Sequence, residues 1–232
     1  MTMIAENLHH VQARMQAAAQ AAGRAPGAVQ LLAVSKTFPA AAVREAFGAG
    51  QYAFGENYIQ EAVEKITALA DLRSQLQWHC IGPIQSNKTR PVAEHFDWVH
   101  TVDRLKIAQR LSEQRPEHLP PLQVCIQVNV DGGATKSGVA PGEALVLARE
   151  VVALPRLQLR GLMCIPEPAP DFEAACAVFT RARSLFDALN AEGLALDTLS
   201  MGMSSDLEAA IHSGSTMVRV GSAIFGARDY TH

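Results

Sequence analysis

Eight short apolar runs, each followed by a stretch of helical periodicity, most restrict the fold open to this chain. They come after an amphipathic opening helix, which is marked by Ile4, Leu8, Val11 and Met15 and ends near Gly23. The predicted strands cover residues 30–35, 52–54, 77–81, 98–102, 123–129, 157–163, 198–201 and 217–220. Strands that alternate with helices pair in parallel, because each helix returns the chain to the end of the sheet at which the strands begin.

Eight parallel strands with intervening helices predict a single-domain (β/α)8 TIM barrel over residues 1–232, with the opening helix as an addition. The predicted helices cover residues 40–47, 56–68, 104–114, 142–154 and 172–192. An open, doubly wound sheet is the alternative. This alternative is less favoured, because no Gly-x-Gly-x-x-Gly fingerprint of a dinucleotide-binding fold follows the first strand.

Lys36 follows the apolar run 31–34 at the end of the first predicted strand. In a parallel barrel this end of the strands carries the active site, so the lysine is expected at the barrel rim. Loss of hydration disfavours the charged form of lysine, and a neutral amine can form an imine with an aldehyde. The alternative is an ordinary surface lysine whose stem covers apolar groups while its charge stays in water.

The loops after the seventh and eighth strands have the composition of a phosphate site, which such barrels often build there. Ser204 and Ser205 supply hydroxyls, and Gly221 and Ser222 allow backbone N–H groups to approach an anion closely. The alternative is that Ser205 only caps a helix and Gly221 only turns the chain. Further residues at the same ends of the strands are Glu56, Asn57, His79, Asn129, Met163 and Met201.

An imine-forming lysine and a phosphate site at one opening indicate a ligand with both an aldehyde and a phosphate, and pyridoxal 5′-phosphate (PLP) is such a ligand. Arg219 is permanently cationic, so it would keep a facing pyridine nitrogen unprotonated and weaken the electron sink. We predict no metal site and no catalytic residue. The predicted cofactor-binding residues are Lys36, Asn57, His79, Met201, Ser204, Ser205, Arg219, Gly221 and Ser222.

Composition argues against several other classes of protein. The net charge of −3 and the scattered Lys and Arg residues do not favour nucleic acid as a partner. Polar and charged residues within the first 20 residues break any signal-peptide core, and no apolar stretch is long enough for a membrane span. Cys80, Cys125, Cys164 and Cys176 lack metal-ligand spacing and are typical of a reducing compartment, so we expect a cytoplasmic protein.

Seven spaced motifs extend over nearly the whole chain: LAVSKT (32–37), FGENYIQE (54–61), WHCIGPIQSNK (78–88), KSG (136–138), GLM (161–163), LSMGMSSD (199–206) and VRVGSAIFG (218–226). Through them the sequence resembles the pyridoxal-phosphate homeostasis proteins, which are similar to the barrel domain of alanine racemase. The resemblance implies that Lys36 carries the aldimine and that Arg219 lies near the ring nitrogen. It also implies that Ser204, Ser205, Gly221 and Ser222 hold the phosphate. The loops 131–135 and 164–168 depart from the family pattern.

The resemblance also bears on catalysis, because alanine racemase takes a second base, a tyrosine, from a C-terminal domain. This chain has only Tyr52, Tyr58 and Tyr230, and none lies in a module resembling that domain. We therefore expect a non-enzymatic protein that holds, buffers or delivers PLP by reversible imine exchange, in vitamin B6 and amino-acid homeostasis. Apo PLP-dependent enzymes are the candidate recipients. We expect a monomer, since the elements that build the racemase dimer are absent.

Three alternatives stay open at this point. A weak single-domain racemase could use His79 or Lys136 as the opposite base, whereas a buried core histidine and a solvated loop lysine are the plainer interpretations. A cofactor-free class I aldolase also uses a barrel lysine but does not explain the 219–222 match. Lys88, in the basic loop 86–90, could hold a second phosphate-bearing molecule or simply face solvent.

Overall fold

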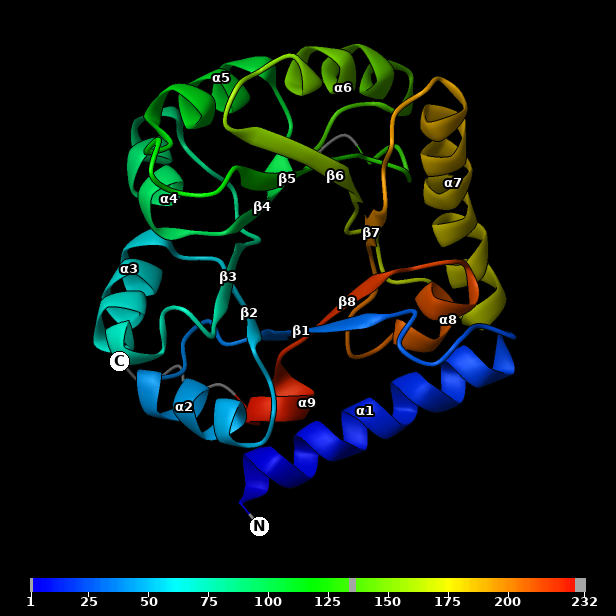
Figure 1. The fold of residues 1–232 in the computed structure, drawn as a ribbon. Coiled ribbons are helices and arrows are strands. Elements are labelled where there is room, and N and C mark those ends of the chain that lie inside the picture. The colour runs from blue at the N-terminus through cyan, green and yellow to red at the C-terminus, as the bar shows by residue number, and fades with distance from the viewer. Residues whose placement is uncertain (1, 134–136, 228–232) are drawn as a thin grey trace.

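The computed structural model describes residues 2–133 and 137–227. Its strands are β1 (Gln30–Val34), β2 (Ala53–Glu56), β3 (Gln77–Cys80), β4 (Trp98–Val102), β5 (Leu122–Gln127), β6 (Leu157–Met163), β7 (Thr198–Ser200) and β8 (Met217–Val220). They pair in parallel in sequence order, and β8 pairs with β1, so the sheet closes into a barrel (Figure 1). The predicted (β/α)8 barrel is therefore confirmed and the open sheet is excluded.

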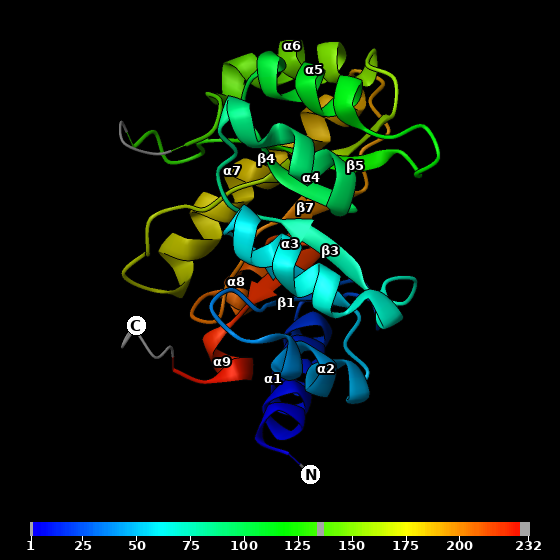
Figure 2. The same cartoon turned by 90° about the vertical axis from the view of Figure 1, so that its left-hand side faces the viewer.

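Helices surround this barrel in the described part of the chain (Figures 1 and 2). They are α1 (Met3–Ala21), α2 (Ala40–Gly48), α3 (Ile59–Ala68), α4 (Thr89–His95), α5 (Leu105–Gln114), α6 (Ala144–Val152), α7 (Phe172–Ala191), α8 (Leu207–His212) and α9 (Ser222–Phe225). Short 3₁₀ helices are η1 (Ala70–Leu72), η2 (Ser86–Lys88) and η3 (Pro141–Glu143). The connections place the carboxyl ends of all the strands at one opening.

Several predicted bounds were wrong by a few residues. The helix predicted from residue 56 begins at Ile59, because Glu56 is paired with Cys80 as the last residue of β2 and is buried. The helical pattern 142–154 divides into η3 and α6. The sequence pattern predicts no helix between the strands at 77–81 and 98–102. The structure forms η2 and α4 in this segment, after a loop.

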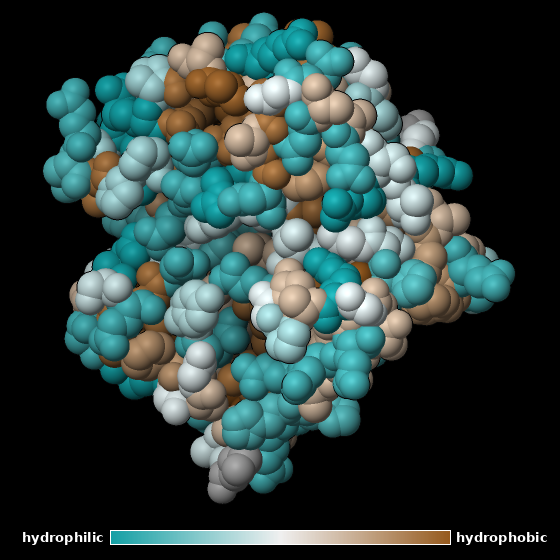
Figure 3. All heavy atoms as spheres, turned by 45° about the vertical axis from the view of Figure 1, so that its right-hand side comes forward, coloured by the Kyte–Doolittle hydropathy of each residue, from teal (hydrophilic) through white to brown (hydrophobic). Residues whose placement is uncertain are grey.

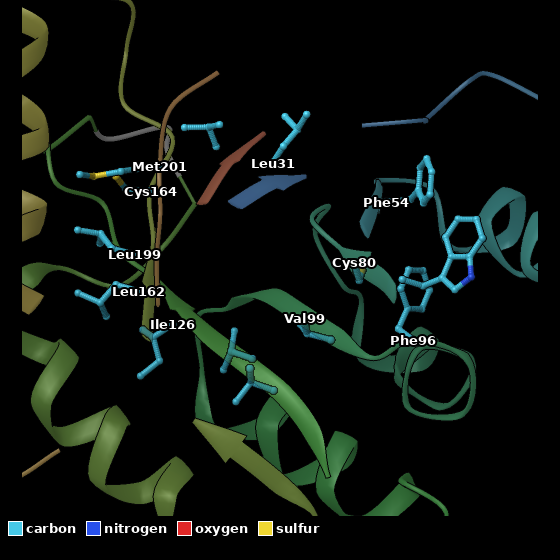
Figure 4. Packing of buried hydrophobic residues seen from close by; sticks show 14 of the residues in the cluster. Leu31, Phe54, Cys80, Phe96, Val99, Ile126, Leu162, Cys164, Leu199 and Met201 are labelled. Atoms are coloured by element: carbon cyan, nitrogen blue, oxygen red, sulfur yellow. The ribbon is translucent and has the colours of Figure 1, made fainter. Parts of the chain in front are cut away.

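The main hydrophobic core lies between the strands and the surrounding helices. Figure 4 shows part of it, with Phe54 and Phe96 on one side of the barrel and Ile126, Leu162 and Leu199 on the other. All of these side chains are buried. Each completely buried side chain of this size contributes roughly 1.5–3 kcal/mol of transfer free energy to folding.

The barrel interior is filled differently from the outer core. Two small apolar clusters are separate from the main one: Leu32, Val34, Ala53, Ile81 and Met217 form the first, and Trp98, Cys125 and Met163 form the second. Buried polar side chains lie on strands of the same barrel, among them His79, His100, Ser200 and Arg219. A buried polar group is costly unless it is hydrogen-bonded, so these side chains are expected to form a connected network.

Helix α1 lies outside the ring of βα units and packs against α8 and α9 (Figure 1). Its buried stripe includes Leu8, Val11 and Met15, as the helical period of the sequence predicts. On the face shown in Figure 3 hydrophilic side chains predominate, and hydrophobic ones are gathered in small groups. None of the helices in the described ranges is both long and apolar enough to cross a bilayer.

Candidate functional site

A cavity of about 330 Å³ lies at the carboxyl ends of the strands. Seven of the nine predicted site residues line it: Lys36, Asn57, Ser204, Ser205, Arg219, Gly221 and Ser222. The other lining residues are Val34, Ile81, Ile165 and Met203, which give the cavity an apolar part. The barrel therefore brings the first strand end and the last two loops to one small opening.

A larger cavity of about 720 Å³ lies between α1 and the segment that leads into β1. Its polar wall comes mainly from Gln12, Gln16, Gln20 and Arg24. The Arg24 guanidinium is already bound to the carbonyl oxygens of Ile211 and Ser215. We place the functional site at the smaller cavity, because a buried cation, a lysine and two loops of small polar residues converge there.

Lys36 lies in a tight turn that joins β1 to α2. The Phe38 N–H donates to the Ser35 carbonyl oxygen at 3.1 Å, so Lys36 and Thr37 are the two central residues of the turn. Thr37 has φ of 69°, in the left-handed region, which costs a β-branched residue about 1–3 kcal/mol. Its N–H donates to Glu61 Oε1 at 2.7 Å, a contact that helps to hold the strained conformation.

A buried ion pair holds Ser35, the residue before Lys36, in place. Lys65 Nζ donates to Glu56 Oε1 at 2.6 Å, to the Ser35 carbonyl at 2.9 Å and to Glu61 Oε1 at 3.1 Å. The Ser35 hydroxyl donates to the same Glu56 oxygen at 2.6 Å. Burial raises the pKa of Glu56, and the neighbouring Lys65 ammonium acts in the opposite direction. Contacts from β2 and α3 therefore hold the backbone before and after Lys36.

Arg219 lies inside the barrel at the end of β8 and is only 4% exposed. Its Nη1 donates to Ser200 Oγ at 2.7 Å and its Nη2 donates to the Cys164 carbonyl at 3.0 Å. Burial lowers the pKa of this guanidinium from its ordinary value, yet arginine stays charged in proteins. The site thus contains a permanent cation in a fixed orientation.

A chain of hydrogen bonds leads from Arg219 through the barrel interior. Ser200 Oγ lies 2.9 Å from His100 Nδ1, and His100 Nε2 lies 2.9 Å from His79 Nδ1. The guanidinium only donates to Ser200, and two tautomer arrangements satisfy the histidine contacts: Ser200 donates to His100 and His100 to His79, or His79 donates to His100 and His100 to Ser200. In both arrangements His79 Nε2 has no hydrogen-bond partner in the described part of the chain.

Both of these histidines are buried and neutral. Burial lowers the pKa of His79 to about 3, and burial together with His79 and Arg219 lowers the pKa of His100 well below its usual value. His79 also stacks on Trp98, with ring centroids 5.1 Å apart. It is not part of the cavity wall, and its place among the cofactor-binding residues stays a prediction. Its side chain is directed into the barrel interior and completes the polar network there.

Met201 is the second predicted residue that does not line the cavity. Its side chain is completely buried in the main hydrophobic core, where Figure 4 shows it near Cys164. The following residue, Gly202, has φ of 99° and accepts a hydrogen bond from the Arg219 N–H at 2.9 Å. The loop therefore reaches the cavity only from Met203 onward.

The loops after β7 and β8 present unpaired donors to the cavity. The N–H groups of Ser204, Ser205 and Ser222 have no acceptor among the hydrogen bonds of the described chain. Gly221 passes so close to Val34 that a Cβ at this position would lie 3.2 Å from the Val34 carbonyl oxygen. Small residues and unpaired N–H groups at one wall form a suitable place for an anion.

Two further lysines were candidates for the site. Lys88 ends η2 and is exposed, and it does not line the cavity. Lys136, the proposed alternative base, lies outside the described residues. No cluster of His, Cys, Asp and Glu side chains suited to a metal ion occurs in residues 2–133 and 137–227.

The Asn57 side chain has a carboxamide oxygen that is buried at the cavity without a hydrogen-bond partner in the described chain. An unpaired acceptor in a cavity wall is a group that a bound ligand or water can satisfy. The loop that carries it is in close contact with Gly82, where an added Cβ would clash with the Asn57 carbonyl oxygen and lie 2.8 Å from its Cα. Gly82 therefore allows two neighbouring loops to meet beside the cavity.

Replacing Gly82 by alanine is expected to displace the Asn57 loop and to destabilise the fold by about 1–3 kcal/mol, the usual cost of overpacking. Urea denaturation of the purified protein measures this change. Gly48→Ala is the matched control, because an added Cβ at Gly48 meets nothing within 4 Å. Equal stability of the two variants would contradict the close contact between the loops.

These residues fit a ligand with an aldehyde and a phosphate. Lys36 is a primary amine on the cavity wall, the 204–205 and 221–222 loops offer unpaired N–H donors, and Arg219 is a fixed buried cation. The apolar lining residues are suited to an aromatic ring. Sequence reasoning missed Lys65, His100 and Ser200, which do not reach the cavity but fix the residues that do.

Comparisons with known proteins agree with this geometry. A family model described as "Alanine racemase, N-terminal domain" matches residues 7–229. The chain is 66% identical over 230 residues to the "Pyridoxal phosphate homeostasis protein" of Pseudomonas aeruginosa, covering 99% of this chain and 98% of that protein. It is 54% identical over 232 residues to the protein of the same name from Escherichia coli, covering 100% and 99%.

Solved structures show the same architecture. PipY of Synechococcus elongatus, solved with PLP bound, superposes with a TM-score of 0.83 at 40% identity and covers 96% of this chain and 100% of that one. Alanine racemase of Corynebacterium glutamicum has a TM-score of 0.67 at 22% identity, over 99% of this chain and 62% of that one. The second likeness shows the barrel fold alone, and the rest of that enzyme has no counterpart in the alignment.

Proposed function

Because this chain belongs to the alanine racemase N-terminal domain family, and within it to the pyridoxal phosphate homeostasis proteins, we propose that it reversibly binds PLP in the cavity at the carboxyl ends of the strands. The observation that carries the proposal is the convergence of Lys36, Arg219 and the 204–205 loop on one cavity. We further propose that the protein holds, buffers or delivers the cofactor to apo PLP-dependent enzymes and works as a monomer.

Each residue has a defined part in this proposal. When bound, PLP supplies an aldehyde whose carbon forms a C=N bond with Lys36 Nζ while its oxygen leaves as water, and hydrolysis reverses the step. Ser204, Ser205, Gly221 and Ser222 hold the phosphate through hydroxyl and N–H donors. Arg219 faces the ring with a permanent positive charge, and Asn57 contributes an acceptor at the cavity wall.

The side chains around the cavity favour binding over catalysis. A two-base racemase needs a second proton-transferring group on the side of the ligand opposite Lys36. The buried His79 is hydrogen-bonded within the barrel, and its lowered pKa, about 3, makes it a poor base. An arginine at the ring nitrogen also keeps the electron sink weak. We therefore propose that carrying the cofactor, not turnover, is the role of this protein.

Transfer of the cofactor tests the delivery role directly. The protein is loaded with PLP, freed of unbound PLP by gel filtration, and mixed with an apo aminotransferase in the presence of a phosphatase that destroys PLP in solution. We expect the acceptor to regain activity in proportion to the loaded protein added, because transfer through direct contact escapes the phosphatase. No recovery with or without phosphatase would contradict delivery, and recovery only without phosphatase would reduce the role to buffering.

Solvent exchange at the α-carbon separates binding from racemisation. The loaded protein is incubated with L-alanine in D₂O, and deuterium at the α-carbon is followed by NMR, with free PLP at equal concentration as the control. We expect exchange no faster than with free PLP, because among the described residues no second base lines the cavity. Exchange clearly faster than the control, together with formation of D-alanine, would favour the racemase.

A further inference from the structure

Arg14, on the additional helix α1, contacts one of the proposed phosphate loops directly. Its Nη2 donates to the carbonyl oxygen of Ser204 at 3.0 Å. The same guanidinium binds both carboxylate oxygens of Glu208, through Nε at 2.9 Å and Nη2 at 3.0 Å. The Arg14 side chain is 29% exposed, so it is partly removed from solvent. A two-point arginine–carboxylate contact has a well-defined geometry, and it therefore fixes the start of α8 relative to α1.

The other phosphate loop also contacts α1. Asn7 Nδ2 donates to the Ile224 carbonyl oxygen at 3.0 Å, in α9, the short helix that begins at Ser222. Asn7 and Arg14 lie two turns apart on one helix, and Leu8 and Val11 between them are completely buried. One rigid element therefore contacts both loops whose N–H groups are unpaired at the cavity.

The charges around the 204–208 segment add a second function for Arg14. Asp206 and Glu208 follow the loop, and a carboxylate near a phosphate disfavours binding of the anion. The Asp206 carboxylate accepts the Met203 N–H at 2.7 Å, and Arg14 compensates the charge of Glu208. Loss of Arg14 would leave the Glu208 carboxylate uncompensated one turn after Ser204.

We propose that Arg14 is a positioning residue for the phosphate of the ligand: with Asn7 it holds the two loops at the spacing that a phosphate needs, and it offsets the charge of Glu208. Neither side chain lines the cavity. This inference rests on the proposed function. It assigns to the additional N-terminal helix a part in choosing phosphorylated over unphosphorylated ligands.

The test compares PLP with pyridoxal, which has the same aldehyde and ring but no phosphate. Dissociation constants for both are measured by absorption titration on the wild type, Arg14→Met, Arg14→Lys and Asn7→Ala. Arg44→Met is the control, because Arg44 forms a two-point contact with Asp71 at 2.8 and 2.9 Å and neither residue lines the cavity. We expect Arg14→Met to weaken PLP binding by about tenfold and pyridoxal binding by less than about twofold.

Arg14→Lys keeps the charge but loses the two-point geometry. If both parts of the proposal hold, its loss of PLP affinity should lie between that of the wild type, which is none, and that of Arg14→Met. Asn7→Ala leaves the ion pair between Arg14 and Glu208 intact and should also weaken the binding of PLP more than that of pyridoxal. This variant keeps the test valid if Arg14→Met does not fold. The proposal would be overturned if Arg14→Met and Asn7→Ala lost equal affinity for PLP and pyridoxal, or lost no affinity for either. Wild-type protein that does not prefer PLP to pyridoxal would instead overturn the phosphate site itself.

Discussion

Lys36→Ala is expected to abolish the covalent attachment of PLP to this protein. Lys36 is a primary amine on the wall of the cavity, in a turn whose backbone is held on both sides by contacts to Glu61 and Lys65. After reduction with borohydride, mass spectrometry should find the pyridoxyl adduct on the Lys36 peptide of the wild type and no adduct in the variant. The affinity for PLP should fall by at least about tenfold, while the phosphate contacts still support weak binding.

Lys88→Ala is the matched control for this experiment, since Lys88 is an exposed lysine outside the cavity wall. The control should retain the adduct on Lys36. An adduct of equal yield on another lysine of the Lys36→Ala variant would contradict the assignment. The rate of PLP release from Lys88→Ala also tests whether Lys88 helps a phosphate-bearing molecule to leave, and an unchanged rate would exclude that role.

Acidification to pH 5 is expected to destabilise the fold through the two buried histidines, by about 2 kcal/mol for His79 alone. The unfolded histidine has a pKa near 6.5, whereas burial lowers the pKa of His79 to about 3 and that of His100 well below 6.5 in the folded protein. Below pH 6.5 the unfolded state therefore binds more protons, and the free energy of unfolding falls with pH. At pH 5 His79 contributes a loss of about 2 kcal/mol relative to pH 7, and His100 adds a loss in the same direction.

Urea denaturation at pH 7 and pH 5 measures this loss. His79→Gln should reduce the difference in unfolding free energy between the two pH values by about 2 kcal/mol, because only the His100 share then remains. His10→Gln is the control, since His10 is exposed on α1, and it should keep the full difference. A pH dependence that is the same in His79→Gln and wild type would show that His79 is not buried and neutral in solution.

The positions of Lys36 and of the last two loops could be predicted from the sequence because they follow from the order of elements. In a parallel barrel every strand ends at the same opening, so a residue just after an apolar run is placed by topology. Met201 does not line the cavity for a local reason. The loop turns through Gly202, with φ of 99°, and leaves the Met201 side chain on the core side of the strand.

The buried hydrogen bonds and ion pair that hold the site residues in place could not be predicted, because they join residues that are distant in the sequence. His79, His100, Ser200 and Arg219 come from four strands, and nothing in the linear pattern pairs them. Lys65 resembles an ordinary surface lysine of an amphipathic helix, yet it is 5% exposed and bound to Glu56. One signal was present: polar residues inside otherwise apolar strands are expensive to bury and indicate an internal network.

Closure of the barrel by β1 and β8 has a consequence for biosynthesis. Lys36 is synthesised long before Arg219, Gly221 and Ser222, and β1 can pair with β8 only after β8 has been made. A nascent chain therefore has the lysine without the buried cation or the second phosphate loop. Because a ligand stabilises only the state that binds it, PLP stabilises finished barrels and gives no support to incomplete chains.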